Sequence, residues 1–285
     1  MNSTQRSRLK DKIFQGVGIT ATVGCVAVLV IFLAFILYQG VDRLSWEFIT
    51  SLPSRFAGQS GIYTAWIGTV WVLVLTTLVS FPLGVGAGIY LEEYGKKSRL
   101  NKFLEINIAN LAGVPSVIYG LLGLEVFVRL MRMGNSILAG SLTLSLLILP
   151  IIIVSTREAI RAVPKTIREA SQALGASKWQ TIRGQILPAS FGGILTGVIL
   201  AISRAVGETA PLIVVGALAY VPFAPRGPLD EFTVLPIQIF NWVSRPQHEF
   251  VINAAAAIIV LLGITFVMNG IAVWMRYRWQ KKLDW

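Results

Sequence analysis

The chain has 285 residues, of which 54% are hydrophobic and 14% charged, and its mean hydropathy is +0.68. A soluble domain of this length covers its surface with polar side chains, so this composition excludes an ordinary soluble protein. The formal net charge is +11, but the basic residues are sorted between alternate loops, which indicates a membrane protein and not nucleic-acid binding.

Long stretches with few or no charged residues recur along the chain, and a helix needs about 20 apolar residues to cross the ~30 Å hydrocarbon core. They predict transmembrane helices at residues 14–38, 63–90, 106–128, 136–155, 190–221 and 251–275. We therefore expect an all-α membrane protein whose residues 1–285 form a single transmembrane domain. The first of these stretches is too long for a signal-peptide core, so we expect it to be kept as an anchor.

The basic residues orient these six helices. If the N-terminus is cytoplasmic, the inside segments are 1–12, 92–105, 157–189 and 276–285, and they hold 18 of the 25 Lys and Arg residues. The outside loops hold 6. This bias predicts a multi-pass protein of the bacterial inner membrane with both termini in the cytoplasm.

The sequence contains no pattern typical of catalysis. It has one cysteine, Cys25, inside the first predicted span, and one histidine, His248, in an outside loop. It has no Cys/His cluster, phosphate-binding loop or nucleophile elbow. We expect no catalytic residue, no metal site and no cofactor bound by this chain.

The third predicted span contains small residues among its apolar ones. Small residues let helices pack closely in lipid, and this is the first interpretation. The second is that the span lines a pathway, in which case Ser116 and Tyr119 are its polar candidates.

The inside segment 157–189 predicts two short helices. Pro164 can begin the first, because its missing N–H falls in the first turn, and Gly175 can end it. Ser177 and Gln180 form a capping box for the second. The first helix carries an apolar stripe of Ile167, Ala170, Ala173 and Leu174. Such a stripe fits a partner protein, or packing on the chain itself or on lipid headgroups.

The fifth predicted span contains two charges, Arg204 and Glu208. A charge at the centre of a membrane helix costs about 2.5–3.5 kcal/mol, so such residues are expected to serve a function. The two lie about 40° apart around a helix and can pair. In a continuous helix over 190–221, Arg204 would lie near the middle of the bilayer.

The same segment contains a proline and a glycine that weaken a helix. Pro211 removes the hydrogen bond to the carbonyl of Gly207, so we expect a local distortion, with Thr209 available to bind the freed backbone groups. A guanidinium suits an oxyanion because it donates two parallel hydrogen bonds. We hypothesise that Arg204, Glu208 and Thr209 line an anion pathway; the alternative is a structural ion pair between helices.

The segment 157–189 resembles the EAA loop of ABC importer permeases, whose pattern is Glu-Ala-Ala, three residues, Gly, nine residues and Ile-x-Leu-Pro. Two positions depart from it, Ser171 in place of the second alanine and Gln185 in place of isoleucine. The resemblance implies the fold of type I importer (MetI-like) permeases and a coupling helix that docks on a cytoplasmic ATPase. The matching residues are Glu169, Ala170, Gly175, Leu187 and Pro188. By this resemblance Glu169, Ala170 and Gly175 contact the ATPase, with Ala173 and Leu174 on the buried stripe.

Four further stretches resemble the permease subunits of phosphate ABC importers, closest to the A-type (PstA-like) subunit. They are PSVIYG at 115–120, LGAS at 174–177, SRAVGETAP at 203–211 and LPIQIFNW at 235–242. The resemblance implies a heterodimer with a C-type permease, two copies of an ATPase that binds ATP and Mg²⁺, and an extracytoplasmic phosphate-binding protein. The Arg-x-x-Gly-Glu-Thr signature is common to the A and C types and does not separate them.

We therefore expect a non-catalytic permease that forms half of the pathway of an ATP-driven phosphate importer. One alternative is a permease for another oxyanion, such as sulfate, molybdate or phosphonate. Another is a proton-coupled anion carrier that uses the Arg204–Glu208 pair as its proton relay.

Overall fold

The computed structural model describes residues 3–95, 98–217 and 220–280, and they are almost entirely helical. The long helices are α1 (Ser3–Gly40), α3 (Tyr63–Ile89), α6 (Ile137–Arg161), α9 (Leu187–Val206) and α12 (His248–Gln280). The shorter helices are α2 (Trp46–Thr50), α4 (Arg99–Leu111), α5 (Ser116–Gly123), α7 (Lys165–Ala173), α8 (Lys178–Thr181), α10 (Ala210–Val215) and α11 (Leu235–Val243). Two π-helical segments continue α3 (η3, Tyr90–Tyr94) and α5 (η4, Leu124–Leu130), and a third joins α8 to α9 (η5, Ile182–Ile186).

Among the described residues, five helices are long and apolar enough to cross a membrane, and a bent pair makes up to six. The predicted all-α membrane fold is thereby confirmed. The predicted span 63–90 agrees with α3 to within one residue at its end, and 136–155 begins one residue before α6 and ends within it.

The third predicted span, 106–128, is wrong as a continuous helix. Helix α4 ends at Leu111 and α5 begins at Ser116, with a bend of 105° between them. Pro115 has no N–H to donate and disfavours helical backbone at the residue before it, which favours a break at this position. Residues 106–124 carry no charge on either side of the bend, which is why hydropathy alone joins them.

The fifth predicted span, 190–221, is also wrong at its ends. The helix that contains α9 runs without interruption from Lys178 and ends at Val206. Helix α10 follows and stops at Gly216, whose φ of +101° favours glycine because it lies in the left-handed region. Residues 218–219, which fall within the predicted span, lie outside the described residues.

Helix α6 is the centre of the bundle and packs against α3, α5, α9 and α10. Small residues make these contacts close: a Cβ atom on Gly84 of α3 would lie 2.6 Å from Cγ2 of Ile152, and one on Gly197 of α9 would lie 2.2 Å from Cβ of Ser155. Polar contacts join the same helices, since the Ser145 hydroxyl donates to the carbonyl of Thr76 at 3.2 Å.

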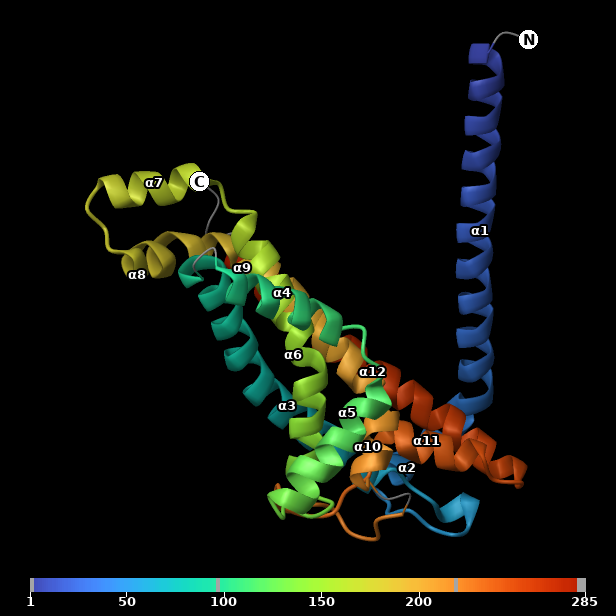
Figure 1. Cartoon of the computed structure of the whole chain (residues 1–285). Helices are drawn as coiled ribbons and strands as arrows, with labels where there is room; N and C mark the ends of the chain where they lie inside the picture. Colours follow the sequence, from blue (N-terminus) through green and yellow to red (C-terminus); the bar gives the residue numbers. More distant parts are fainter. Residues whose placement is uncertain (1–2, 96–97, 218–219, 281–285) are drawn as a thin grey trace.

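Helix α1 stands apart from this bundle and touches it only near the C-terminal end of the helix, beside α12 (Figure 1). Its apolar side chains are exposed over most of its length, as expected of a helix that faces hydrocarbon or another subunit. Helices α7 and α8 project from one end of the bundle, and α2 and α11 lie at the other (Figure 1).

Candidate translocation and coupling sites

The chain breaks between α9 and α10, at the residues for which the sequence predicts a distortion. Gly207 follows the last residue of α9, and Pro211 lies in the first turn of α10. The N–H groups of Gly207 and Glu208 donate to the carbonyls of residues three positions earlier, at 3.2 and 3.3 Å, which tightens the end of α9. The Thr209 hydroxyl reaches the Gly207 carbonyl at 3.5 Å, the limit of a hydrogen bond.

Arg204 and Glu208 pair across this break. Nε of Arg204 lies 3.2 Å from Oε1 of Glu208, and the two side chains are 43% and 17% exposed. Arg204 lies in the last turn of α9 and not in the middle of a continuous helix, contrary to the sequence-based expectation. Among the described contacts, the guanidinium donates only through Nε, so its terminal nitrogens keep donors for a ligand.

Helix α5 lies directly against α10 and so belongs to the same site. A Cβ atom on Gly120 would lie 2.8 Å from Cα of Pro211, so the close approach requires glycine there. Tyr119 is buried, and its hydroxyl donates to the carbonyl of Leu111 at 2.8 Å, across the α4–α5 bend. Ser116 begins α5 and is partly exposed.

Tyr119 therefore holds the bend between α4 and α5. We expect Tyr119→Phe to cost about 1 kcal/mol of stability, because the Leu111 carbonyl loses its donor. The midpoint of thermal unfolding in detergent should fall by about 2–4 °C. Tyr38→Phe, on an exposed ring of α1, is the control, and equal midpoints for the two variants would contradict this role.

One polar contact of this region was not predicted from the sequence. The hydroxyl of Ser203 and Oδ1 of Asn269 lie 2.8 Å apart and join α9 to α12 next to Arg204. Asn269 is an amide in an otherwise apolar stretch of α12. An amide inside a membrane helix usually bonds to a neighbouring helix, and this signal could have found it.

The segment between α6 and α9 forms a helical hairpin, as the sequence predicts. Gly175 after α7 has a φ of +85°, and Ser177 and Gln180 form the reciprocal capping box at the start of α8. Ser171 of α7 and Thr181 of α8 share a hydrogen bond of 2.9 Å. Ile167 packs on the small cluster Ile160, Val163, Ile182 and Ile186.

The other side of α7 is free in this chain. Glu169, Ala170, Ala173 and Gly175 are exposed, and Leu174 is 90% exposed. The predicted apolar stripe is thus divided: Ile167 packs on the protein itself, whereas the residues after it face outward. An apolar side chain as exposed as Leu174 at a protruding tip is typical of a contact with another protein.

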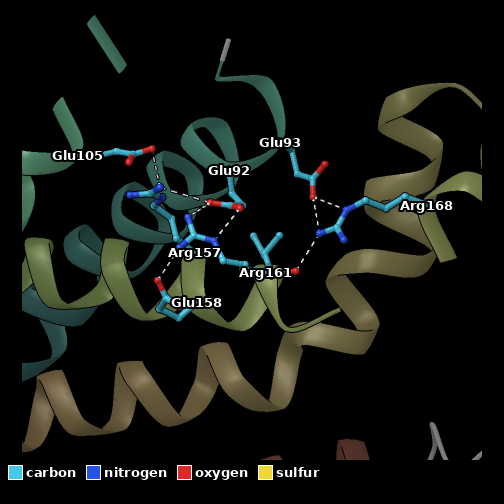
Figure 2. A network of polar contacts seen from close by, with 8 residues as sticks. Glu92, Glu93, Glu105, Arg157, Glu158, Arg161 and Arg168 are labelled. Carbon is cyan, nitrogen blue, oxygen red and sulfur yellow. Dashed lines mark hydrogen bonds and ion pairs between the residues drawn. The ribbon is translucent and has the colours of Figure 1, made fainter. Parts of the chain in front are cut away.

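A network of ion pairs lies between α7 and the bundle (Figure 2). Arg157 of α6 reaches Glu105 of α4 at 2.7 Å and Glu92 of η3 at 3.4 Å. Its neighbours Arg161 and Arg168 reach Glu92 and Glu93, each at 2.9 Å. These residues lie on four separate segments, which the network ties together where α3 and α6 end.

The described residues include no group of three or more His, Cys, Asp or Glu side chains placed to hold a metal ion.

Broken membrane helices are a feature that many membrane transport proteins share. Residues 80–281 match the family of binding-protein-dependent transport system inner membrane components. The chain belongs to this family of ABC importer permeases, and it is a multi-pass inner-membrane protein.

Several relatives in this family match almost the whole chain. A probable ABC transporter permease protein of Bacillus subtilis, YqgI, is 34% identical over 97% of this chain and 98% of its own length. The phosphate transport system permease protein PstA 1 of Mycobacterium tuberculosis is 32% identical over 96% of this chain and 91% of its own. The phosphate transport system permease protein PstA of Yersinia pestis is 34% identical over 82% of this chain and 79% of its own length.

The fold is that of a solved importer. A chain of the MetNI methionine ABC transporter in an inward-facing conformation superposes with a TM-score of 0.60 at 17% identity, covering 76% of this chain and 95% of that one. This similarity confirms the predicted fold of importer permeases.

Proposed function

We propose that this chain is a permease subunit of an ATP-driven phosphate importer and forms half of its translocation pathway. The observation that carries the proposal is the partly exposed Arg204 guanidinium at the break between α9 and α10. Arginine provides a fixed charge and a planar fork of donors that match phosphate oxygens, and basic side chains line anion pathways in membranes. The relatives named as phosphate permeases support the choice of anion.

The proposal includes partners. These are a second, C-type permease, a dimer of an ATPase subunit that binds ATP and Mg²⁺, and an extracytoplasmic phosphate-binding protein. The exposed side of α7 is the surface offered to the ATPase. The distribution of basic residues supports cytoplasmic termini, with α7 and α8 on the same side.

The test of the substrate is selective stimulation of ATP hydrolysis. The chain is reconstituted with candidate partners, and hydrolysis is measured with binding protein loaded with phosphate, sulfate, molybdate or a phosphonate. We expect stimulation with phosphate alone. Stimulation by another of these anions in place of phosphate would assign the chain to a different oxyanion importer.

The test of the docking surface is Leu174→Glu. Because Leu174 is 90% exposed, the change should leave the fold intact, yet an unpaired carboxylate buried in an apolar contact costs about 2 kcal/mol or more. ATP-driven uptake should fall about 30-fold, and the ATPase subunit should co-purify poorly. Gln172→Glu is the matched control, since residue 172 is exposed about 160° away around the helix. Equal co-purification for both variants would contradict docking at Leu174.

A further inference from the structure

We infer that Arg168 is a positioning residue that joins the coupling helix α7 to the ends of α3 and α6, so that Arg168 and Glu93 transmit the movement of α7 to α3. The inference rests on the proposed function, in which α7 receives its movement from an ATPase. The sequence places Arg168 on the polar side of α7, opposite the apolar stripe that includes Ala170, Ala173 and Leu174.

The Arg168 side chain lies at the junction of three segments. Its Nε and Nη2 atoms donate to Oε1 of Glu93 at 3.0 and 2.9 Å, and Glu93 belongs to η3, the continuation of α3. Nη1 donates to the carbonyl of Val163 at 2.7 Å, and Nη2 also donates to that of Ile160 at 2.8 Å. One guanidinium therefore binds α7 to both neighbouring segments (Figure 2).

The two carbonyls explain why an arginine is needed here. Ile160 lies in the last turn of α6, where its carbonyl also accepts from the N–H of Val163 at 3.2 Å, and Val163 follows the end of the helix, where the last carbonyls lack the usual helical donors. A cation at this position also interacts favourably with the helix dipole. Lysine carries the same charge but cannot reach a carboxylate and two carbonyls with a planar fork.

Burial separates this ion pair from those of Arg161, while Arg157 and Glu92 form a second buried pair whose side chains are 10% and 18% exposed. The side chains of Arg168 and Glu93 are 20% and 9% exposed, whereas Arg161, which pairs with Glu92 and Glu158, is 52% exposed. Shielding from water strengthens an ion pair with good geometry and makes the loss of one partner costly. An exposed pair contributes about 0–1 kcal/mol, so Arg161 is a control of the same residue type seven positions away.

The remaining contacts of α7 lead to a different part of the bundle. Ser171 bonds to Thr181 of α8, and Ile167 packs beside Ile182 and Ile186 of η5, which leads into α9. Without Arg168, α7 would keep these contacts with α8 and η5, and the backbone would still connect it to α6. Its hydrogen-bonded link to η3, the continuation of α3, would be lost, which leaves the apolar cluster that Ile167 shares with Ile89 of α3. A movement imposed on α7 would then be transmitted to α3 by apolar packing without a directional polar contact.

The experiment uses the assembled importer in proteoliposomes and measures anion taken up per ATP hydrolysed. We expect Arg168→Met and Glu93→Gln to retain the ATPase subunit, because the exposed side of α7 is unchanged, but to lower this ratio about tenfold. Arg168→Lys should give an intermediate ratio. Arg161→Met should change it by less than about threefold.

Three results would overturn the inference. Wild-type ratios in Arg168→Met and Glu93→Gln would show that the pair transmits nothing. A parallel loss of uptake and hydrolysis at a constant ratio would show a purely structural role, and Glu93→Gln and Arg168→Lys supply this comparison if Arg168→Met does not fold. If the ratio fell equally in Arg161→Met, the buried pair of Arg168 would be no more important for transmission than the exposed pairs of Arg161. If the wild-type complex moves an oxyanion other than phosphate, the proposed substrate fails while the ratio for that oxyanion still tests Arg168.

Discussion

Replacing Arg204 with alanine in the assembled importer is expected to reduce phosphate uptake about 100-fold or more. The change removes the guanidinium fork and leaves Glu208, which is 17% exposed, without its partner. An unpaired carboxylate beside the path repels an anion, and the planar fork of donors that matches phosphate oxygens is lost. Initial rates of phosphate uptake, normalised to the amount of complex, measure the effect.

Three further variants separate the roles of the two charges. Arg204→Lys keeps the positive charge but lacks the planar fork of donors, so the rate of phosphate uptake should fall about tenfold. Combining Arg204→Ala with Glu208→Ala should recover part of the loss, because no carboxylate remains alone. Arg129→Ala is the matched control, since Arg129 forms an i,i+4 pair with Glu125 in which both side chains are about two-thirds exposed. Uptake by Arg204→Ala within twofold of wild type would make its pair a structural one.

Replacing Gly84 with valine is expected to prevent close packing of α3 on α6 and to destabilise the bundle. The new Cβ would lie 2.6 Å from Cγ2 and 2.8 Å from Cβ of Ile152. Rotation of a side chain cannot move a Cβ atom, so the helices must separate, at a cost of roughly 3 kcal/mol or more. We expect the midpoint of thermal unfolding in detergent to fall by about 5–10 °C, with a lower yield of folded protein.

Gly86→Val is the matched control for this change. It lies two residues away on the same helix, and a Cβ atom there meets nothing within 4 Å. Both variants place the same β-branched residue in α3, so helix propensity cancels between them. If Gly84→Val unfolds at the temperature of Gly86→Val, glycine is not what allows α3 and α6 to pack closely.

The sequence predicts well those features that depend on neighbouring residues. The hydropathy of 63–90 locates α3, and the spacing of Pro164, Gly175, Ser177 and Gln180 gives the hairpin of α7 and α8 with its capping box. Each of these signals is read within one turn or one span, and no distant contact is needed to interpret it.

The wrong span ends have a common physical cause. Helix α10 is apolar because it packs against α5 and α6, and residues 106–124 carry no charge although α4 and α5 meet within them at 105°. Hydropathy reports that a segment avoids water but not whether lipid or protein covers it. Hydropathy therefore predicts one continuous span where the chain forms two helices with a break between them.

The residues missed in the site depend on tertiary structure. Arg168 pairs with Glu93, which lies 75 positions earlier in the chain, and Ser203 forms a hydrogen bond with Asn269, which lies 66 positions later. A polar residue on the hydrophilic face of an amphipathic helix ordinarily faces water, so the pattern of α7 gave no reason to select Arg168. Arg168 joins three segments only because the fold brings the ends of α3 and α6 beside α7.

The most direct test of the central claim is phosphate uptake into proteoliposomes that contain this chain, with and without its permease and ATPase partners. The assembled complex with phosphate-loaded binding protein should take up phosphate only when ATP is present on the side of the ATPase, and a proton gradient should not replace ATP. Phosphate uptake by this chain alone, driven by a proton gradient, would contradict the account and identify a proton-coupled carrier.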